Sequence, residues 1–120
     1  MATMNSVIEQ VDRLNPNIYL ESDKYGWMNT LDGLVAREVM GQEAPAYKEP
    51  DDADKELLVP YPYDDLYPLY MSAMIYFYNR EYDHYNNVIL QFNARYEQFK
   101  AWYIRNNKTC KAQNFRNVMG

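Results

Sequence analysis

Apolar side chains recur every three or four residues between residues 82 and 103, and this is the strongest pattern in the chain. The positions that share this spacing are Tyr82, Tyr85, Ile89, Phe92, Tyr96, Phe99 and Tyr103. Residues three and four apart lie on the same side of an α-helix, and most of the intervening residues are polar. The pattern therefore predicts an amphipathic helix with one face packed and the other in water.

The preceding segment predicts a second helix that is apolar on most of its circumference. Its apolar positions are Leu66, Leu69, Tyr70, Met71, Ala73, Met74, Ile75, Phe77 and Tyr78. Asp64 or Asp65 can cap its first turn, where Pro68 is also tolerated. We expect the helix to end near Asn79 and a short turn to follow, which would make the two helices an antiparallel hairpin. A single continuous helix is the alternative.

Two shorter helices are predicted in the N-terminal third. Ser6 and Glu9 have the spacing of a capping box, which indicates a helix from Ser6 to Leu14 that ends before Pro16. A second helix is expected from Asp23 to Met40, with Ser22 or Asp23 as its N-cap. Its apolar stripe consists of Trp27, Leu31, Leu34, Val35 and Val39.

Glycines give further signals in this second helix. Gly41 follows it directly, as expected for a residue that ends a helix in the left-handed conformation. Gly26 and Gly33 lie inside it and each costs about 1 kcal/mol relative to alanine. We therefore expect them to allow close approach of a neighbouring helix.

Residues 41–63 predict a long irregular loop, because they contain four prolines and many acids. Its apolar piece, Leu57-Leu58-Val59, is followed by Pro60-Tyr61-Pro62-Tyr63 and should be extended. Two interpretations remain open at this stage. The segment could dock on another molecule, for example as an added strand, or its side chains could hold the loop against the chain's own core.

These elements together predict an all-α fold, a four-helix bundle with a C-terminal antiparallel hairpin and a long acidic, proline-rich loop at 41–63. A length of 120 residues fits one domain that can bury a modest core without a metal or a disulfide. We expect residues 1–106 to form that domain. Residues 107–120 lack periodicity and predict a basic, flexible tail.

Tyrosine is the unusual feature of the composition, with 13 tyrosines against 4 phenylalanines. Tyrosine is favoured where protein surfaces meet, because its ring is apolar and its hydroxyl can bond to polar groups. An aromatic-rich core would need the same composition. The two explanations remain open from the sequence alone.

Charge is distributed unevenly along the chain. The net charge of −5 argues against a general nucleic-acid binder. Residues 43–65 carry eight acids and two lysines, whereas no acid follows Glu97 and five basic residues do. The basic end also contains aromatic residues that could stack on single-stranded nucleic acid. A complementary protein surface, including the acidic loop of another copy, would suit these cations equally well.

The residues with catalytic or ligand-binding chemistry are few. His84 is the only histidine and is expected on the polar side of the last helix, where it is solvated. Cys110 is the only cysteine, so no intramolecular disulfide can form, and an unpaired thiol is expected. The acidic run Asp51-Asp52-Ala53-Asp54 lacks the glycine and the closing glutamate of an EF-hand loop. No enzymatic activity, cofactor, metal, signal peptide or membrane span is predicted, and we expect an intracellular, soluble protein.

Several short motifs carry a family resemblance that extends from about Asn15 to Asn106. They are Asn15-Pro16-Asn17, Trp27-Met28-Asn29, Leu57-Leu58-Val59-Pro60, the run from Tyr61 to Tyr67, the run from Glu81 to Asn87, and Phe92-Asn93. The chain resembles the small helical proteins encoded in the head and packaging gene clusters of tailed phages and prophages of Gram-positive bacteria. These proteins are generally assigned to the head-tail connector or adaptor class, which docks beneath the portal as a ring.

The resemblance implies a structural subunit of the virion neck, which is made in the bacterial cytoplasm and forms a homo-oligomeric ring with the portal and other neck or tail proteins as partners. It implies contact with nucleic acid only as passing DNA. We expect the intersubunit or portal contacts at Leu57, Leu58, Val59, Tyr61, Tyr63, Lys100, Arg105, Lys108, Lys111, Phe115 and Arg116. The alternatives are a tail-completion or stopper protein, and a small phage regulatory or DNA-associated protein. An enzyme built on His84, Asp83 and the tyrosines is weaker, because no base, nucleophile and orienting group can be named together.

Overall fold

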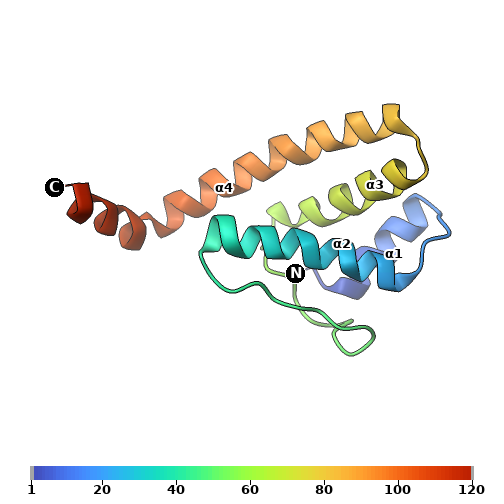
Figure 1. The fold of residues 1–120 in the computed structure, drawn as a ribbon, viewed down its shortest axis with the longest axis horizontal. Coiled ribbons are helices and arrows are strands. Elements are labelled where there is room, and N and C mark those ends of the chain that lie inside the picture. The colour runs from blue at the N-terminus through green and yellow to red at the C-terminus, as the bar shows by residue number, and fades with distance from the viewer. Residues whose placement is uncertain (1, 120) are drawn as a thin grey trace.

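The computed structural model describes residues 2–119, with side chains described up to Asn106. In this part of the chain it contains α-helices and no strand (Figure 1). The elements are α1 (Met4–Leu14), α2 (Glu21–Leu34), the π-helical turns η1 (Val35–Met40), the 3-10 turn η2 (Tyr63–Asp65), α3 (Leu66–Tyr78) and α4 (Tyr82–Met119). The predicted all-α class is therefore confirmed.

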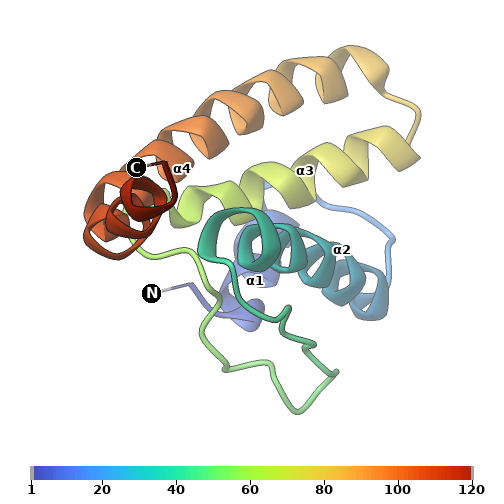
Figure 2. The same cartoon turned by 60° about the vertical axis from the view of Figure 1, so that its left-hand side comes forward.

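Helices α3 and α4 form the expected antiparallel hairpin, and α3 also contacts α1 and α2 (Figures 1 and 2). The turn between them begins after Tyr78, as predicted, and includes Arg80 at a φ of 64°. The left-handed backbone conformation of Arg80 stops the helical path of α3, so the chain reverses direction within a few residues before α4 starts. Helix α3 is thus the central element around which the others pack.

The aromatic stripe of α4 is only partly a core stripe. Phe92, Tyr96 and Phe99 are buried, whereas Tyr82 at the start of the helix is exposed. Tyr96 stacks on Phe92, which in turn packs against Tyr70 of α3. The helix does not end near Asn106, as we expected, but continues to Met119. Its last turns extend beyond the other helices (Figure 1).

Helix α1 begins earlier than predicted, because its N-cap is Thr3 and Ser6 is the third helical residue. The Thr3 hydroxyl accepts a hydrogen bond from the Ser6 N–H at 3.1 Å, and the Ser6 hydroxyl accepts one from the Thr3 N–H at 2.9 Å. The pair satisfies two amides that the helix itself leaves unbonded. The capping box assigned to Ser6 and Glu9 was therefore wrong, since a hydroxyl at the third position replaces the expected glutamate.

The second predicted helix exists as α2 followed by η1, and it ends at Gly41 with a φ of 66°, as expected. Asp23 is not its N-cap residue. Its carboxylate instead accepts a hydrogen bond from the N–H of Leu20, the residue at the cap position, at 3.3 Å. The close helix approach expected at the glycines was wrong, since Gly26 has open space around it and Gly33 faces Ala44 of the loop at an ordinary distance.

The loop between η1 and η2 is irregular, as predicted, and it folds back along the start of α1. Leu57 donates its N–H to Ala2 O at 2.9 Å, and Asn5 donates to Ala53 O at 2.8 Å. Leu57 and Val59 are buried in the same core as the helices. Of the two interpretations of Leu57-Leu58-Val59, the structure therefore shows the second, in which the segment holds the loop to its own core.

Tyr96 provides a test of the core. Its side chain is 8% exposed and its hydroxyl has no hydrogen-bond partner among the described residues. Burial, with the charges of Glu38 and Glu97, raises the pKa of Tyr96 to about 12. Because an unpaired buried hydroxyl destabilises the native state, we expect Tyr96→Phe to raise the free energy of unfolding by about 1 kcal/mol in chemical denaturation.

The matched control is Tyr67→Phe, which removes a buried hydroxyl that is hydrogen-bonded to Asp32 and Val59. We expect this variant to lower the free energy of unfolding by about 1–3 kcal/mol, since it leaves polar partners unsatisfied. Equal losses in the two variants would contradict the assignment of Tyr96 as unpaired.

Candidate functional site

The carboxylate of Asp32, on α2, is fully inaccessible to solvent. The hydroxyl of Tyr67 donates to its Oδ1 at 2.7 Å, while the hydroxyl of Tyr47 and the N–H of Leu58 donate to its Oδ2 at 2.5 and 3.1 Å. The Tyr67 hydroxyl also accepts from the N–H of Val59 at 2.6 Å. A buried carboxylate is tolerated when its oxygens are satisfied in this way.

The pKa shifts of the groups in this network determine which of them donate and which accept hydrogen bonds. Burial raises the pKa of Asp32, although the hydrogen bonds from Tyr47, Tyr67 and Leu58 oppose that effect. Burial and the neighbouring carboxylate raise the pKa of both tyrosines, so their hydroxyls stay protonated. Asn29, one turn before Asp32, adds a two-way pair with the backbone of Tyr47, at 2.7 and 3.1 Å. The network therefore joins the loop to α2 and α3.

The sequence-predicted interface residues in the loop lie in different environments. Leu57 and Val59 are buried, and Leu58 is half-buried against the core. Tyr61 is 77% exposed, and so it is the residue of this group with a free aromatic surface. Tyr63 is half-buried and packs on Phe99 and Trp102 of α4.

Among the predicted basic residues, Lys100 is half-buried and Arg105 is exposed on α4. The side chains of Lys108, Lys111, Phe115 and Arg116 lie outside the described part of the chain. Arg95, which the sequence did not single out, has its guanidinium 4.7 Å from the centre of the Tyr63 ring. Its Nε also donates to Asp65 at 3.0 Å. This cation is thus held between a ring and a carboxylate within the protein.

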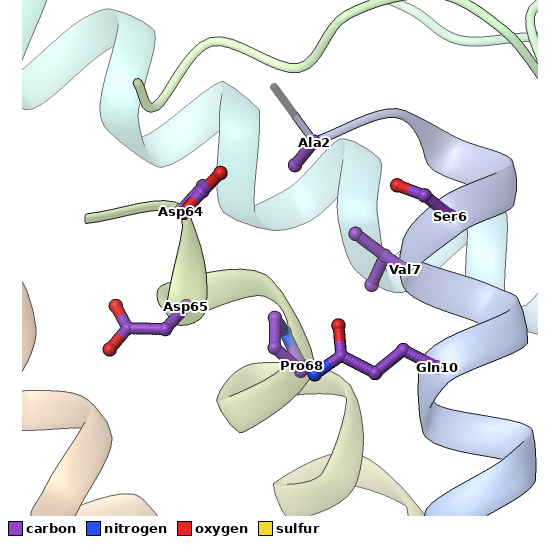
Figure 3. Close-up of a pocket in the computed structure, with 7 residues that line it drawn as sticks. All are labelled: Ala2, Ser6, Val7, Gln10, Asp64, Asp65 and Pro68. Carbon is purple, nitrogen blue, oxygen red and sulfur yellow. The ribbon is translucent and has the colours of Figure 1, made fainter. Parts of the chain in front are cut away.

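A cavity of about 280 Å³ lies between the first turns of α1 and the start of α3 (Figure 3). It is lined by Ala2, Ser6, Val7, Gln10, Asp64, Asp65 and Pro68. Its polar groups do not converge, because the Ser6 hydroxyl is used in the α1 cap and the Asp65 carboxylate points away toward Arg95. The cavity therefore offers no paired groups for acid–base or nucleophilic chemistry.

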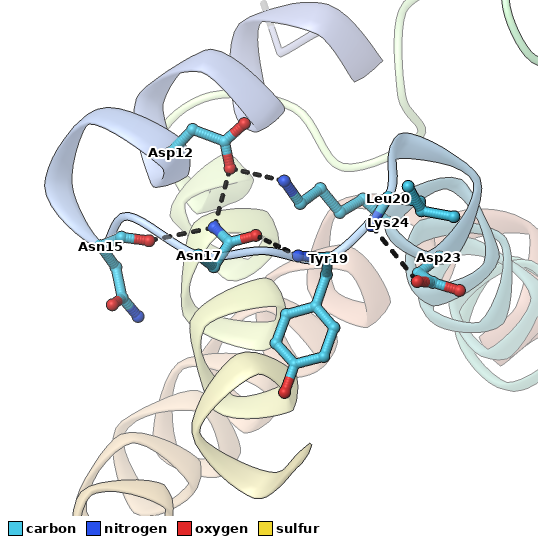
Figure 4. Close-up of polar contacts among 7 residues, drawn as sticks. All are labelled: Asp12, Asn15, Asn17, Tyr19, Leu20, Asp23 and Lys24. Carbon is cyan, nitrogen blue, oxygen red and sulfur yellow. Dashed lines mark hydrogen bonds and ion pairs between the residues drawn. The ribbon is translucent and has the colours of Figure 1, made fainter. Parts of the chain in front are cut away.

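The connector between α1 and α2 is fixed by a polar cluster (Figure 4). The ammonium group of Lys24, whose side chain is buried, donates to Asp12 Oδ1 at 2.7 Å. The amide of Asn17 donates to the same oxygen at 2.9 Å, and its own oxygen accepts from the N–H of Tyr19 at 3.2 Å. Because a buried ammonium requires such partners, this cluster sets the path of the connector and the position of Tyr19.

Tyr19 joins two aromatic residues from other elements. Its ring meets Trp27 of α2 edge to face with centroids 5.7 Å apart, and it lies 6.3 Å from the ring of Tyr78. Trp27 and Tyr78 are nearly parallel, with centroids 5.8 Å apart. The hydroxyl of Tyr19 donates to Asn79 Oδ1 at 2.7 Å. The sequence predicted Trp27 in the apolar stripe of the second helix, but no spacing signal indicated that it meets Tyr19 and Tyr78.

The remaining chemical candidates have structural surroundings. His84 is exposed on α4, with its ring 5.2 Å from that of Tyr76. The Cys110 side chain lies outside the described residues. Within the described part of the chain, no group of three or more histidine, cysteine or acidic side chains is arranged to hold a metal ion.

The titration of Asp32 can be tested through stability. Burial raises the pKa of Asp32 in the native state above the unfolded value of about 3.9. The contribution of Asp32 to the free energy of unfolding is therefore largest at a pH below the unfolded pKa, and it falls as the pH rises through the native pKa. We expect Asp32→Asn to cost about 1–3 kcal/mol at neutral pH, because an amide cannot accept at both positions. The cost should become larger as the pH is lowered toward 4 in urea unfolding.

Asp51→Asn is a matched control, because it removes an exposed carboxylate from the same loop. A cost of Asp32→Asn that grows with rising pH would show instead that the three hydrogen bonds lower the native pKa of Asp32. A variant as stable as the parent would show that the network does not hold the loop.

The comparisons with known proteins found no family model, no curated protein and no solved structure that matches this chain. Among the described residues, no helix combines the length and apolar character needed to cross a lipid bilayer.

Proposed function

We propose that this protein is a structural subunit of a phage neck, a head-tail connector or adaptor that docks on the portal and closes into a homo-oligomeric ring. The sequence resemblance suggests this class. The observation that carries the proposal is the group of exposed apolar side chains around the α3–α4 turn, together with the exposed ring of Tyr61 near the other end of α3. Such surfaces mark sites of protein contact when they are contiguous and large.

One of these surfaces, which we name the turn patch, surrounds the α3–α4 turn and the α1–α2 connector. Its exposed residues are Ile18, Leu20, Phe77, Tyr78 and Tyr82. The other is Tyr61, which precedes the first turn of α3. Helix α3 separates them, and its 13 residues span about 20 Å. The two surfaces cannot meet within one molecule, so contact between them would join successive copies head to tail, as a ring requires.

The distribution of charge also supports head-to-tail contact between successive copies. The loop exposes Glu43, Glu49, Asp51, Asp54 and Glu56, whereas Arg105 is exposed on α4. Opposite charges on separate parts of a subunit favour one orientation of neighbouring copies and disfavour the others. The end of α4 extends away from the core and provides reach toward a neighbour (Figure 1).

The proposal is tested by mass measurement in solution, first on the protein alone and then after mixing with a portal ring from a phage of this type. We expect a ring-sized complex in the mixture. Tyr61→Ser should keep the melting temperature, because this side chain is 77% exposed, and should reduce ring formation at least about tenfold. The buried residue Leu57 should behave differently, since Leu57→Ser is expected to lower stability by about 2–5 kcal/mol.

Leu90→Ser is the control for Tyr61, because it removes an exposed apolar side chain from the outer face of α4, away from both surfaces. It should leave melting and assembly unchanged. Failure of the parent protein to bind the portal ring would exclude the connector role, and normal assembly of Tyr61→Ser would exclude the loop from the interface.

A further inference from the structure

The rings of Tyr19, Trp27 and Tyr78 and the carboxylate of Asp23 line a cavity of about 240 Å³ at the junction of the connector, α2 and α3. Asp23 and Trp27 lie four residues apart on α2, so both side chains point from the same face of the helix. Tyr19 lines the cavity from the connector, and Tyr78 lines it from the end of α3. Three aromatic residues therefore surround a site that also contains a negative charge.

The Asp23 carboxylate has capacity for a further partner. Its Oδ2 accepts the N–H of Leu20 at 3.3 Å, which is long for a hydrogen bond, and no other donor among the described residues reaches it. The nearest lysine in sequence, Lys24, is turned to Asp12 instead. Among the described residues, no lysine or arginine lies over any of the three rings. The site thus has the groups that attract a cation and holds none from its own chain.

The same chain shows how such groups hold a guanidinium. Arg95 lies 4.7 Å from the centre of the Tyr63 ring while its Nε bonds Asp65 at 3.0 Å. That arrangement combines one ring and one carboxylate, both partly accessible to solvent, with the side-chain oxygen of Gln98 and the carbonyl of Pro62 as further acceptors at 2.8 and 2.9 Å. The cavity at Trp27 offers the same pair of groups with two additional rings, and tryptophan attracts cations more strongly than tyrosine does.

We propose that this cavity, the Trp27 site, binds the guanidinium of an arginine side chain presented by another protein. Arginine fits better than lysine, because its planar group stacks on aromatic rings and bonds a carboxylate at the same time. The surrounding surface favours a protein over a free small cation. Ile18 and Leu20 on either side of Tyr19 are 93% and 67% exposed, and Phe77 and Tyr82 are exposed beside Tyr78. A protein that inserts an arginine would also cover these residues.

The site is tested with a short peptide, acetyl-Gly-Arg-Gly-amide, and its citrulline counterpart, which has the same shape without the charge. We expect the arginine peptide to shift the indole N–H resonance of Trp27 saturably in NMR titration. The citrulline peptide should bind about tenfold more weakly, because it loses the cation–π and ionic attraction. Equal shifts from the two peptides, or shifts that do not saturate, would overturn the proposal.

Two pairs of variants separate recognition from folding. Asp23→Asn and Tyr78→Leu should each weaken the binding of the arginine peptide by roughly fivefold. Glu21→Gln removes an exposed charge from the same turn of α2, and Tyr82→Leu removes an exposed ring that does not line the cavity. Both controls should change binding by less than about twofold. Equal losses in Glu21→Gln and Asp23→Asn would indicate general attraction by negative charge and overturn the site.

A partner bound at the Trp27 site would cover the turn patch, so it would bind a copy whose turn patch is not already in contact with the next copy of the proposed ring. The peptide test itself does not depend on the neck function. A Trp27 resonance that moves when the protein alone is concentrated, and stops moving in Asp23→Asn, would place a second copy of this chain in the site. That result would overturn the assignment to a different protein while leaving the test of portal binding unaffected.

Discussion

The constraint on which the structure depends is the burial of one carboxylate. Asp32 is fully inaccessible, and its oxygens are satisfied by two tyrosine hydroxyls and one backbone amide that come from the loop and from α3. An uncompensated charge at this position would cost several kcal/mol, so the carboxylate and the folded loop require one another. This mutual requirement explains how a segment with four prolines and little regular structure keeps a fixed path across the helices.

The same constraint decides which apolar side chains of the loop are buried. The Asp32 network holds the backbone of Leu58 and Val59, and the buried side chains of Leu57 and Val59 then fill the core beside it. Leu57 and Val59, which the sequence predicted as contacts with another molecule, are therefore buried in the core of their own chain. Exposed apolar side chains lie elsewhere on the molecule, among them Tyr61 and the residues around the α3–α4 turn.

Helices could be predicted from the sequence because their signals are local. The spacing of aromatic residues in α4 and the turn after Tyr78 depend on neighbours within a few positions, and both were placed correctly. The Asp32 network and the Trp27 site were missed because each joins residues from three separate segments, which no periodicity encodes. The available signal for Asp32 was its position four residues after Met28 and three before Val35, on an apolar side of the helix. The extension of α4 beyond Asn106 was missed because that segment lacks an apolar face, which was taken to exclude a helix.

The abundance of tyrosine admitted two explanations, a core and an interface, and the structure has some tyrosines in the core and others on the surface. Tyr47 and Tyr67 lie in the core, where their hydroxyls are needed as donors to Asp32, so phenylalanine could not replace them without leaving a charge unpaired. Tyr61, Tyr78 and Tyr82 have no such constraint and remain largely exposed. Tyr78 and Tyr82 contact the rings of Trp27 and Phe77 at the surface, and Tyr61 has the most exposed ring of the three. The tyrosines therefore occupy two separate environments, a core in which a buried carboxylate needs hydroxyl donors and a surface on which the rings stay exposed.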